Sequence, residues 1–158
     1  MNMNMTRTEM PGEEAEIAKA YLQEVLVDLI DLTLQAKQAH WNVVGPRFRS
    51  VHLELDDLVE ITRRFGDTVA ERIVTLGDPA VGSPSEVGHQ TKLDPLPSGF
   101  LKDADVVKEF VERLSEICAR MRRNLGALSE RDPVSHDLLV QILGRLEEKM
   151  WMFHAQTH

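Results

Sequence analysis

The fold that the sequence predicts is all-α: a four-helix bundle with one long crossover between its second and third helices. Three observations predict it. Apolar residues recur every three or four positions in four long segments, which is the spacing of one face of an α-helix. Eight glycines and prolines gather between residues 77 and 101, where they disfavour a long regular helix. The chain shows no convincing strand pattern and no internal repeat, and its 158 residues suit a single domain.

A short break separates the first two predicted helices. Residues 1–12 read as a flexible N-terminal arm, and residues 13–158 as the bundle domain. The first helix is predicted from about Glu13 to Ala39, with an apolar face wide enough for burial on two sides. Gly45-Pro46 ends this pattern, and the second helix is predicted to continue to Leu76. Gly66 should weaken that helix by up to about 1 kcal/mol relative to alanine. We interpret this glycine as a local packing or dimer-contact effect.

The crossover spans residues 77–101, with one short helix predicted near Ser83–Val87. A connection of this length allows the second and third helices to run parallel. Asp103 or Asp105 is predicted to cap the third helix, because a side-chain carboxylate can accept the free N–H groups of a first turn. Asp132-Pro133 predicts the start of the fourth helix, as an N-cap followed by proline at the first helical position.

The second helix carries an unusual polar face. At about 100° per residue, Asp56 lies about 40° from His52, Asp67 about 60° and Glu71 about 100°, so all four project to one side. Asp56 and Asp67 are eleven residues apart, or about 16 Å along the axis, which is too far for one ion to reach both. The face therefore holds two separate pairs with i,i+4 spacing, His52/Asp56 and Asp67/Glu71.

One pair alone is a poor metal site, and two interpretations stay open. In the first, two copies of the helix lie antiparallel about a two-fold axis near residues 61–62, which creates two identical sites between subunits. In the second, the face is an ordinary solvated surface. His40, which ends the first helix twelve residues before His52, favours the first interpretation. Histidine and carboxylate ligands together suit iron, zinc or manganese.

Two motifs in this region resemble those of a known family. The run His40-Trp41-Asn42-Val43-Val44-Gly45, followed by His52 and Asp56, resembles the ferroxidase signature of the Dps family (DNA-binding protein from starved cells), the mini-ferritins. Asp67-Thr68-Val69-Ala70-Glu71-Arg72, followed by Leu76-Gly77, resembles the second signature of that family. The helical pattern extends the resemblance to roughly residues 14–154, and the fold it implies is a ferritin-like four-helix bundle.

The resemblance implies a ferroxidase-type oxidoreductase that acts on metal ions. A shell of twelve identical subunits, built from two-fold dimers, would oxidise Fe(II) with hydrogen peroxide, store Fe(III) as a mineral and so protect against oxidative stress. Asp67 and Glu71 of one subunit would bind iron with His40 of its two-fold mate. His52 and Asp56 of the mate would bind a second, weaker iron directly or through water. Trp41 would be the electron donor beside the site, although an aromatic anchor at a helix corner is the alternative.

Charge and composition limit the other function classes. The formal net charge of −8 argues against general affinity for nucleic acid, so DNA binding is expected to be weak or absent. The absence of any run of 18 apolar residues predicts no membrane span, and a cytoplasmic location is expected, with association with the nucleoid as the alternative. Cys118, the only cysteine, is expected in the core. The competing functions are a nucleoid protein that protects DNA by physical binding and a helical interaction module.

Several further residues are functional candidates. Glu86-Val87-Gly88-His89 matches the Glu-x-x-His element of larger di-iron proteins, but it occurs once and among helix breakers. Arg72 is a candidate to balance the carboxylates, and Asp137 is a weak candidate for an acidic iron-entry pore. Trp151 is expected to pack. The remaining histidines are expected at the surface: His136, His154 and His158.

Overall fold

The computed structural model describes residues 12–157, so most of the predicted arm and His158 lie outside the described part of the chain. Its helices and strands, in chain order, are α1 (Gly12–Asn42), β1 (Val43–Val44), α2 (Phe48–Thr75), α3 (Pro84–Gln90), β2 (Leu101–Lys102), α4 (Asp103–Leu128), α5 (Pro133–His154) and the short 3₁₀ helix η1 (Ala155–Thr157). The predicted four-helix bundle with a short helix in its crossover is confirmed.

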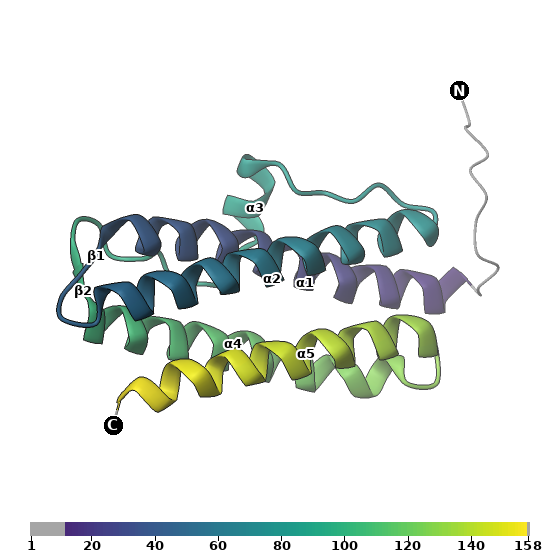
Figure 1. The fold of residues 1–158 in the computed structure, drawn as a ribbon. Coiled ribbons are helices and arrows are strands. Elements are labelled where there is room, and N and C mark those ends of the chain that lie inside the picture. Colours follow the sequence, from purple (N-terminus) through teal and green to yellow (C-terminus); the bar gives the residue numbers. More distant parts are fainter. Residues whose placement is uncertain (1–11, 158) are drawn as a thin grey trace.

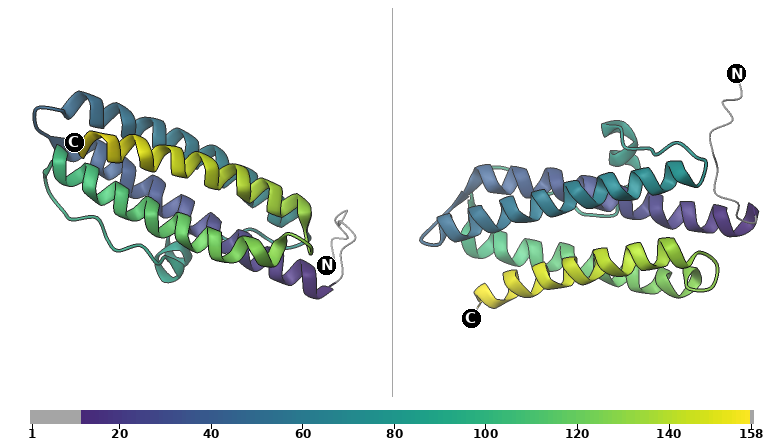
Figure 2. Two further views of the ribbon diagram at one scale, coloured as in Figure 1. Left: turned by 90° about the horizontal axis from the view of Figure 1, so that it is seen from below. Right: turned by 45° about the vertical axis from the view of Figure 1, so that its right-hand side comes forward.

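The bundle consists of two antiparallel helix pairs, α1 with α2 and α4 with α5 (Figures 1 and 2). The crossover returns the chain to the end of the bundle where α2 began, so α2 and α4 run in the same direction, as predicted. On the way it forms α3, which lies outside the bundle against α1. The core is continuous along all four helices, and within it Phe110 of α4 stacks on Phe153 of α5 with ring centroids 5.7 Å apart. No described helix is long and apolar enough to cross a membrane.

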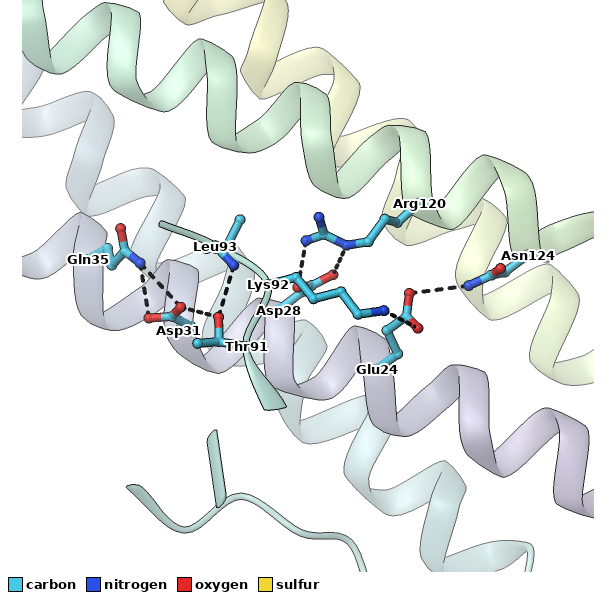
Figure 3. A network of polar contacts seen from close by, with 9 residues as sticks. All are labelled: Glu24, Asp28, Asp31, Gln35, Thr91, Lys92, Leu93, Arg120 and Asn124. Carbon is cyan, nitrogen blue, oxygen red and sulfur yellow. Dashed lines mark hydrogen bonds and ion pairs between the residues drawn. The ribbon is translucent and has the colours of Figure 1, made fainter. Parts of the chain in front are cut away.

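Polar contacts hold the crossover against the bundle (Figure 3). The hydroxyl of Thr91 donates to Asp31 at 2.5 Å, and Lys92 Nζ lies 3.0 Å from a carboxylate oxygen of Glu24. Beside them, the guanidinium of Arg120 on α4 donates two hydrogen bonds to the buried carboxylate of Asp28 on α1. These contacts fix residues 91–93 against α1, next to the ion pair that joins α1 to α4.

The ends of the helices differ in places from the sequence expectations. Asp132 caps α5 and accepts the N–H of Ser135, as predicted. The prediction that Asp103 or Asp105 is the N-cap of α4 is wrong, because the N-cap residue is Lys102, whose side chain makes no capping hydrogen bond. The carboxylate of Asp103 accepts the N–H of Ala104 in the first turn of α4 at 2.7 Å, and also the N–H of Arg47, the residue before α2, at 2.6 Å. Asp103 therefore ties the start of α4 to the start of α2.

A parallel pair of two-residue strands, which the sequence did not predict, closes one end of the bundle. Val43 pairs with Leu101 and Val44 with Lys102. Two residues are too few to show alternation, and the hydrogen bonds of this pair depend on a partner far away in the sequence. Gly45, which follows β1, has a φ of +135°, and a Cβ there would lie 2.7 Å from Cγ of Asp103. Glycine is therefore required for the tight corner between α1 and α2.

Candidate metal centre

The corner between α1 and α2 brings two of the predicted ligands into direct contact. His40 lies in the last turn of α1 and His52 in the second turn of α2. Their rings stack with centroids 3.6 Å apart and an angle of 20° between the ring planes. Phe48 packs beside His52, with ring centroids 4.9 Å apart. His40 is buried and His52 is half-buried, so the pair forms part of the wall of the bundle.

Each imidazole is oriented by the backbone of the other residue. Nδ1 of His40 lies 2.9 Å from the carbonyl oxygen of His52, and Nδ1 of His52 lies 2.9 Å from the carbonyl oxygen of His40. A carbonyl oxygen only accepts, so both Nδ1 atoms must carry the proton. In the neutral ring the lone pair then lies on Nε2, which is the form that binds a metal ion. The backbone carbonyls thus supply the orienting partners that metal-binding histidines need.

Asp56 lies one turn beyond His52 and belongs to the same group. One carboxylate oxygen of Asp56 is 3.5 Å from Nδ1 of His40 and 2.6 Å from Nζ of Lys37. The hydrogen bond from Lys37 lowers the pKa of Asp56 below its ordinary value of 3.8. Sequence reasoning missed Lys37, although its place three residues before His40 puts it on the same face of α1. Lys37 neutralises the carboxylate that would bind the second metal ion.

Replacing Lys37 should therefore strengthen metal binding at Asp56. In Lys37→Met the pKa of Asp56 should rise towards 3.8, so the carboxylate stays ionised at neutral pH and loses its competing cation. Both side chains are more than a third exposed, and such a pair contributes up to about 1 kcal/mol, or about fivefold in affinity. Anaerobic titration with Co²⁺ should show the second, weaker ion binding up to about fivefold more tightly. Unchanged affinity would show that Lys37 does not compete with the metal ion.

The other two predicted ligands lie further along α2. Asp67 and Glu71 are exposed, and neither side chain has a hydrogen bond or an ion pair within the described part of the chain. Eleven residues separate Asp67 from Asp56, which corresponds to about 16 Å of helix. Within residues 12–157 no three His, Cys, Asp or Glu side chains converge in a group that could hold a metal ion. The predicted ligands of one subunit therefore form two separate groups, His40, His52 and Asp56 at the α1–α2 corner and Asp67 and Glu71 further along α2, which are named here the two candidate half-sites.

Three other sequence expectations need correction. Arg72 does not balance Asp67 or Glu71, because its guanidinium donates to Asp132 and Ser135 at the start of α5. Trp151 does not pack in the bundle, since 63% of its surface is exposed. Trp41 is 67% exposed and does not anchor the corner within its own subunit. Both tryptophans lie on outward faces of their helices, which apolar periodicity alone does not distinguish from the core.

The remaining candidates lie away from this region. Glu86 and His89 lie on α3, so the motif is helical after all, but both side chains are exposed and His89 Nδ1 contacts the carbonyl oxygen of Ser85. His154 and Asp137 are exposed and His136 is half-buried. Cys118 lies in the core as expected, where burial raises the pKa of its thiol to about 12.

Comparisons with known proteins agree with this architecture. A family model of the ferritin-like domain matches residues 19–158. The DNA protection during starvation protein of Agrobacterium fabrum is 34% identical over 158 residues, which cover 99% of this chain and 98% of that protein. The Dps of Mycobacterium smegmatis superposes with a TM-score of 0.92 at 30% identity, covering 99% of both chains. The Dps of Microbacterium arborescens gives a TM-score of 0.87 at 31% identity, covering 92% of this chain and 95% of that one.

Identity, coverage and fold thus agree over almost the whole chain, including all of α2. The chain belongs to the Dps family of ferritin-like proteins.

Proposed function

We propose that this chain is an iron-sequestering mini-ferritin that oxidises Fe(II), with hydrogen peroxide as oxidant, and stores Fe(III) in a dodecameric shell. The observation that carries the proposal is the pair of candidate half-sites, one at the α1–α2 corner and one further along α2. His40 and His52 are held with Nε2 available at one end, and two carboxylates without partners in the described chain lie at the other. The relative from Microbacterium arborescens has been solved in a high iron form, which supports iron as the substrate.

The outer face of α1 and α2 supports a two-fold dimer. Leu34 and Trp41 are exposed there, 59% and 67% respectively. Next to them lies a largely apolar groove of about 410 Å³ between the two helices, whose lining includes Gly66 and Asp67. A Cβ on Gly66 would meet only a methyl group of Leu26 at 4.0 Å, so packing within the subunit does not require glycine. Close approach of a second copy over this groove would explain why position 66 is a glycine.

The dimer completes the site by symmetry. With two α2 helices antiparallel about residues 61–62, the histidine end of one helix lies opposite the carboxylate end of the other. Asp67 and Glu71 of one subunit then bind iron with His40 of its mate, and His52 and Asp56 of the mate hold the second iron. The same operation produces an identical site at the other end of the interface, so each dimer has two.

The proposed reaction is balanced by two ferrous ions for each peroxide. Each Fe(II) gives up one electron, the O–O bond of hydrogen peroxide takes both, and its two oxygens leave as hydroxide or water. No hydroxyl radical is released when both electrons arrive together. Hard carboxylate oxygens favour Fe(III) over Fe(II), which drives the oxidation, while neutral imidazole still accepts Fe(II). Trp41, next to His40, is the proposed donor when an oxidising equivalent has no second iron to receive it.

The test follows iron oxidation in the intact protein. Ferrous iron is added without oxygen, then peroxide or air, and the ferric absorbance is recorded for the wild type and for Asp67→Asn/Glu71→Gln. We expect fast oxidation by peroxide, slower oxidation by air, and loss of both in the double variant. Rates equal to the protein-free control for wild type and variant alike would mean that the carboxylate face is only solvated surface.

A charged side chain introduced into the proposed interface should abolish iron oxidation although no proposed ligand is changed. Leu34 is mostly exposed, so Leu34→Glu should change the stability of the isolated subunit by less than about 0.5 kcal/mol. Buried against a second copy, the unpaired carboxylate should prevent dimerisation. We expect light scattering to show monomers and iron oxidation to fall to the protein-free rate, whereas Leu34→Met should behave like the wild type. A fully assembled, active Leu34→Glu protein would exclude this face as the interface.

Physical protection of DNA is the second candidate function, because the relative from Agrobacterium fabrum is named for DNA protection. The net charge of −8 disfavours it, since binding to phosphates depends on a positive surface. We expect no shift in the mobility of plasmid DNA at neutral pH and physiological salt. A clear shift would favour the nucleoid-associated function. The proposed location is the cytoplasm, where both iron and DNA are available.

A further inference from the structure

Arg72, which follows Glu71 in α2, contacts the start of α5. Its Nε donates to the hydroxyl of Ser135 at 3.0 Å, and its Nη2 lies 3.1 Å from both carboxylate oxygens of Asp132. The side chain of Arg72 is 14% exposed and that of Asp132 is 3% exposed. A planar guanidinium held at two of its nitrogens fixes orientation as well as distance.

The partners of Arg72 form the N-terminal cap of α5. Asp132 is the N-cap residue of that helix, and its carboxylate also accepts the N–H of Ser135 at 3.2 Å. Ser135 itself is completely buried. Arg72 therefore binds to a cap that is already fixed by its own helix, and it transmits that position to α2.

The carboxylate half-site depends on this tie for its position. Asp67 and Glu71 have no side-chain partner in the described chain, so the backbone of α2 alone places them. The segment that carries them begins directly after Gly66, which weakens helical order within α2, and it includes the last turns of that helix, which ends at Thr75. Apolar side chains of this segment, such as Val69 and Ile73, are buried in the core. Apolar contacts are not directional, so they define the rotation of the helix about its axis less sharply than a directed hydrogen bond does.

We propose that Arg72 is a positioning residue for Asp67 and Glu71, acting through Asp132 and Ser135 of α5. The inference rests on the proposed function, since it concerns how the half-site is held for iron. Arg72 touches neither the metal ion nor the oxidant. It sets the rotation of the last turns of α2, and so the direction in which both carboxylates face the two-fold mate. A displacement there should weaken iron binding even though every ligand is present.

The experiment compares two conservative substitutions in matched ion pairs. Arg72→Lys keeps the positive charge but removes the planar guanidinium that binds Asp132 and Ser135 through two nitrogens. Arg120→Lys makes the same change in a comparable ion pair with Asp28, where the side chains are 11% and 3% exposed. This second pair touches none of the proposed ligands. For each intact protein we would measure the unfolding temperature, the Co²⁺ concentration at half-saturation without oxygen, and KM and kcat for Fe(II).

We expect both substitutions to lower the unfolding temperature by similar amounts. Only Arg72→Lys should raise the Co²⁺ half-saturation and the KM for Fe(II), by about tenfold, which is the usual effect of disturbing the support of a metal ligand. Arg120→Lys should stay within about twofold of the wild type. Ser135→Ala, which removes one acceptor and keeps Asp132, should give a smaller shift in the same direction and serves as the milder variant if Arg72→Lys does not fold.

Equal Co²⁺ half-saturation in wild type, Arg72→Lys and Ser135→Ala would overturn the positioning role and leave the proposed function intact. A shift of the same size in Arg120→Lys would also overturn it, because the effect would then follow stability alone. A wild-type protein that binds no Co²⁺ and oxidises no iron would overturn the proposed function, and this inference with it.

Discussion

An equal mixture of two inactive variants should recover about a quarter of the wild-type rate of iron oxidation, if each site is shared across a two-fold axis. The first variant, Asp67→Asn/Glu71→Gln, lacks both carboxylates. The second, His40→Gln/His52→Gln, lacks both imidazoles. In a mixed dimer one site collects all four substitutions and the other collects none. Random pairing makes half of the dimers mixed, and half of their sites are intact, so about one site in four works.

The measurement requires exchange of subunits before the assay. The two variants would be mixed, dissociated, reassembled, and assayed with peroxide as the wild type is. Each variant reassembled alone is the control and should stay at the protein-free rate. A mixture that also stays there, with light scattering showing normal assembly, would show that one subunit supplies all the ligands of its own site. The result would be decisive because the two half-sites of one subunit lie about 16 Å or more apart along α2.

Asp28→Ala should lower the free energy of unfolding by about 3 kcal/mol or more. Asp28 is 3% exposed and accepts two hydrogen bonds from Arg120, at 3.2 and 2.8 Å. The variant leaves a nearly buried guanidinium without its counter-charge next to the contacts that hold the crossover (Figure 3). Chemical denaturation followed by circular dichroism would measure the loss. A change below about 1 kcal/mol would show that Arg120 finds other partners or water.

Replacing both members of this pair is the informative control. Burial raises the pKa of Asp28 above its ordinary value of 3.8 despite the opposing effect of Arg120, so the folded state disfavours the charged carboxylate. The intact pair therefore contributes little to the net free energy of unfolding, whereas removing one partner is strongly destabilising because the other charge stays buried and unpaired. We expect Asp28→Leu/Arg120→Met to lose less stability than Asp28→Ala. A double variant less stable than the single one would contradict this account.

Much of the fold could be predicted from the sequence, because it depends on periodic burial. The apolar stripes at helical spacing place four helices, the glycines and prolines of residues 77–101 place the crossover, and Asp132-Pro133 starts α5 at the expected residue. The errors lie where one partner is distant in sequence. The β1–β2 pair joins residues 58 positions apart, and Asp103 accepts the N–H of Arg47, 56 positions away at the start of α2, as well as an N–H of its own first turn. Local sequence patterns do not predict partners that are distant in the chain.

The candidate site divides in the same way. The sequence by itself determined which residues share a face of α2, and that His52/Asp56 and Asp67/Glu71 cannot reach one ion, because helix geometry fixes rotation and rise. Only the tertiary structure decided how these residues are held. It brings His40 against His52, fixes both Nδ1 protons on backbone carbonyls, sets Lys37 on Asp56 and turns Arg72 towards α5. Periodicity specifies the side of a helix, whereas a hydrogen-bond partner depends on which other helix packs against that side.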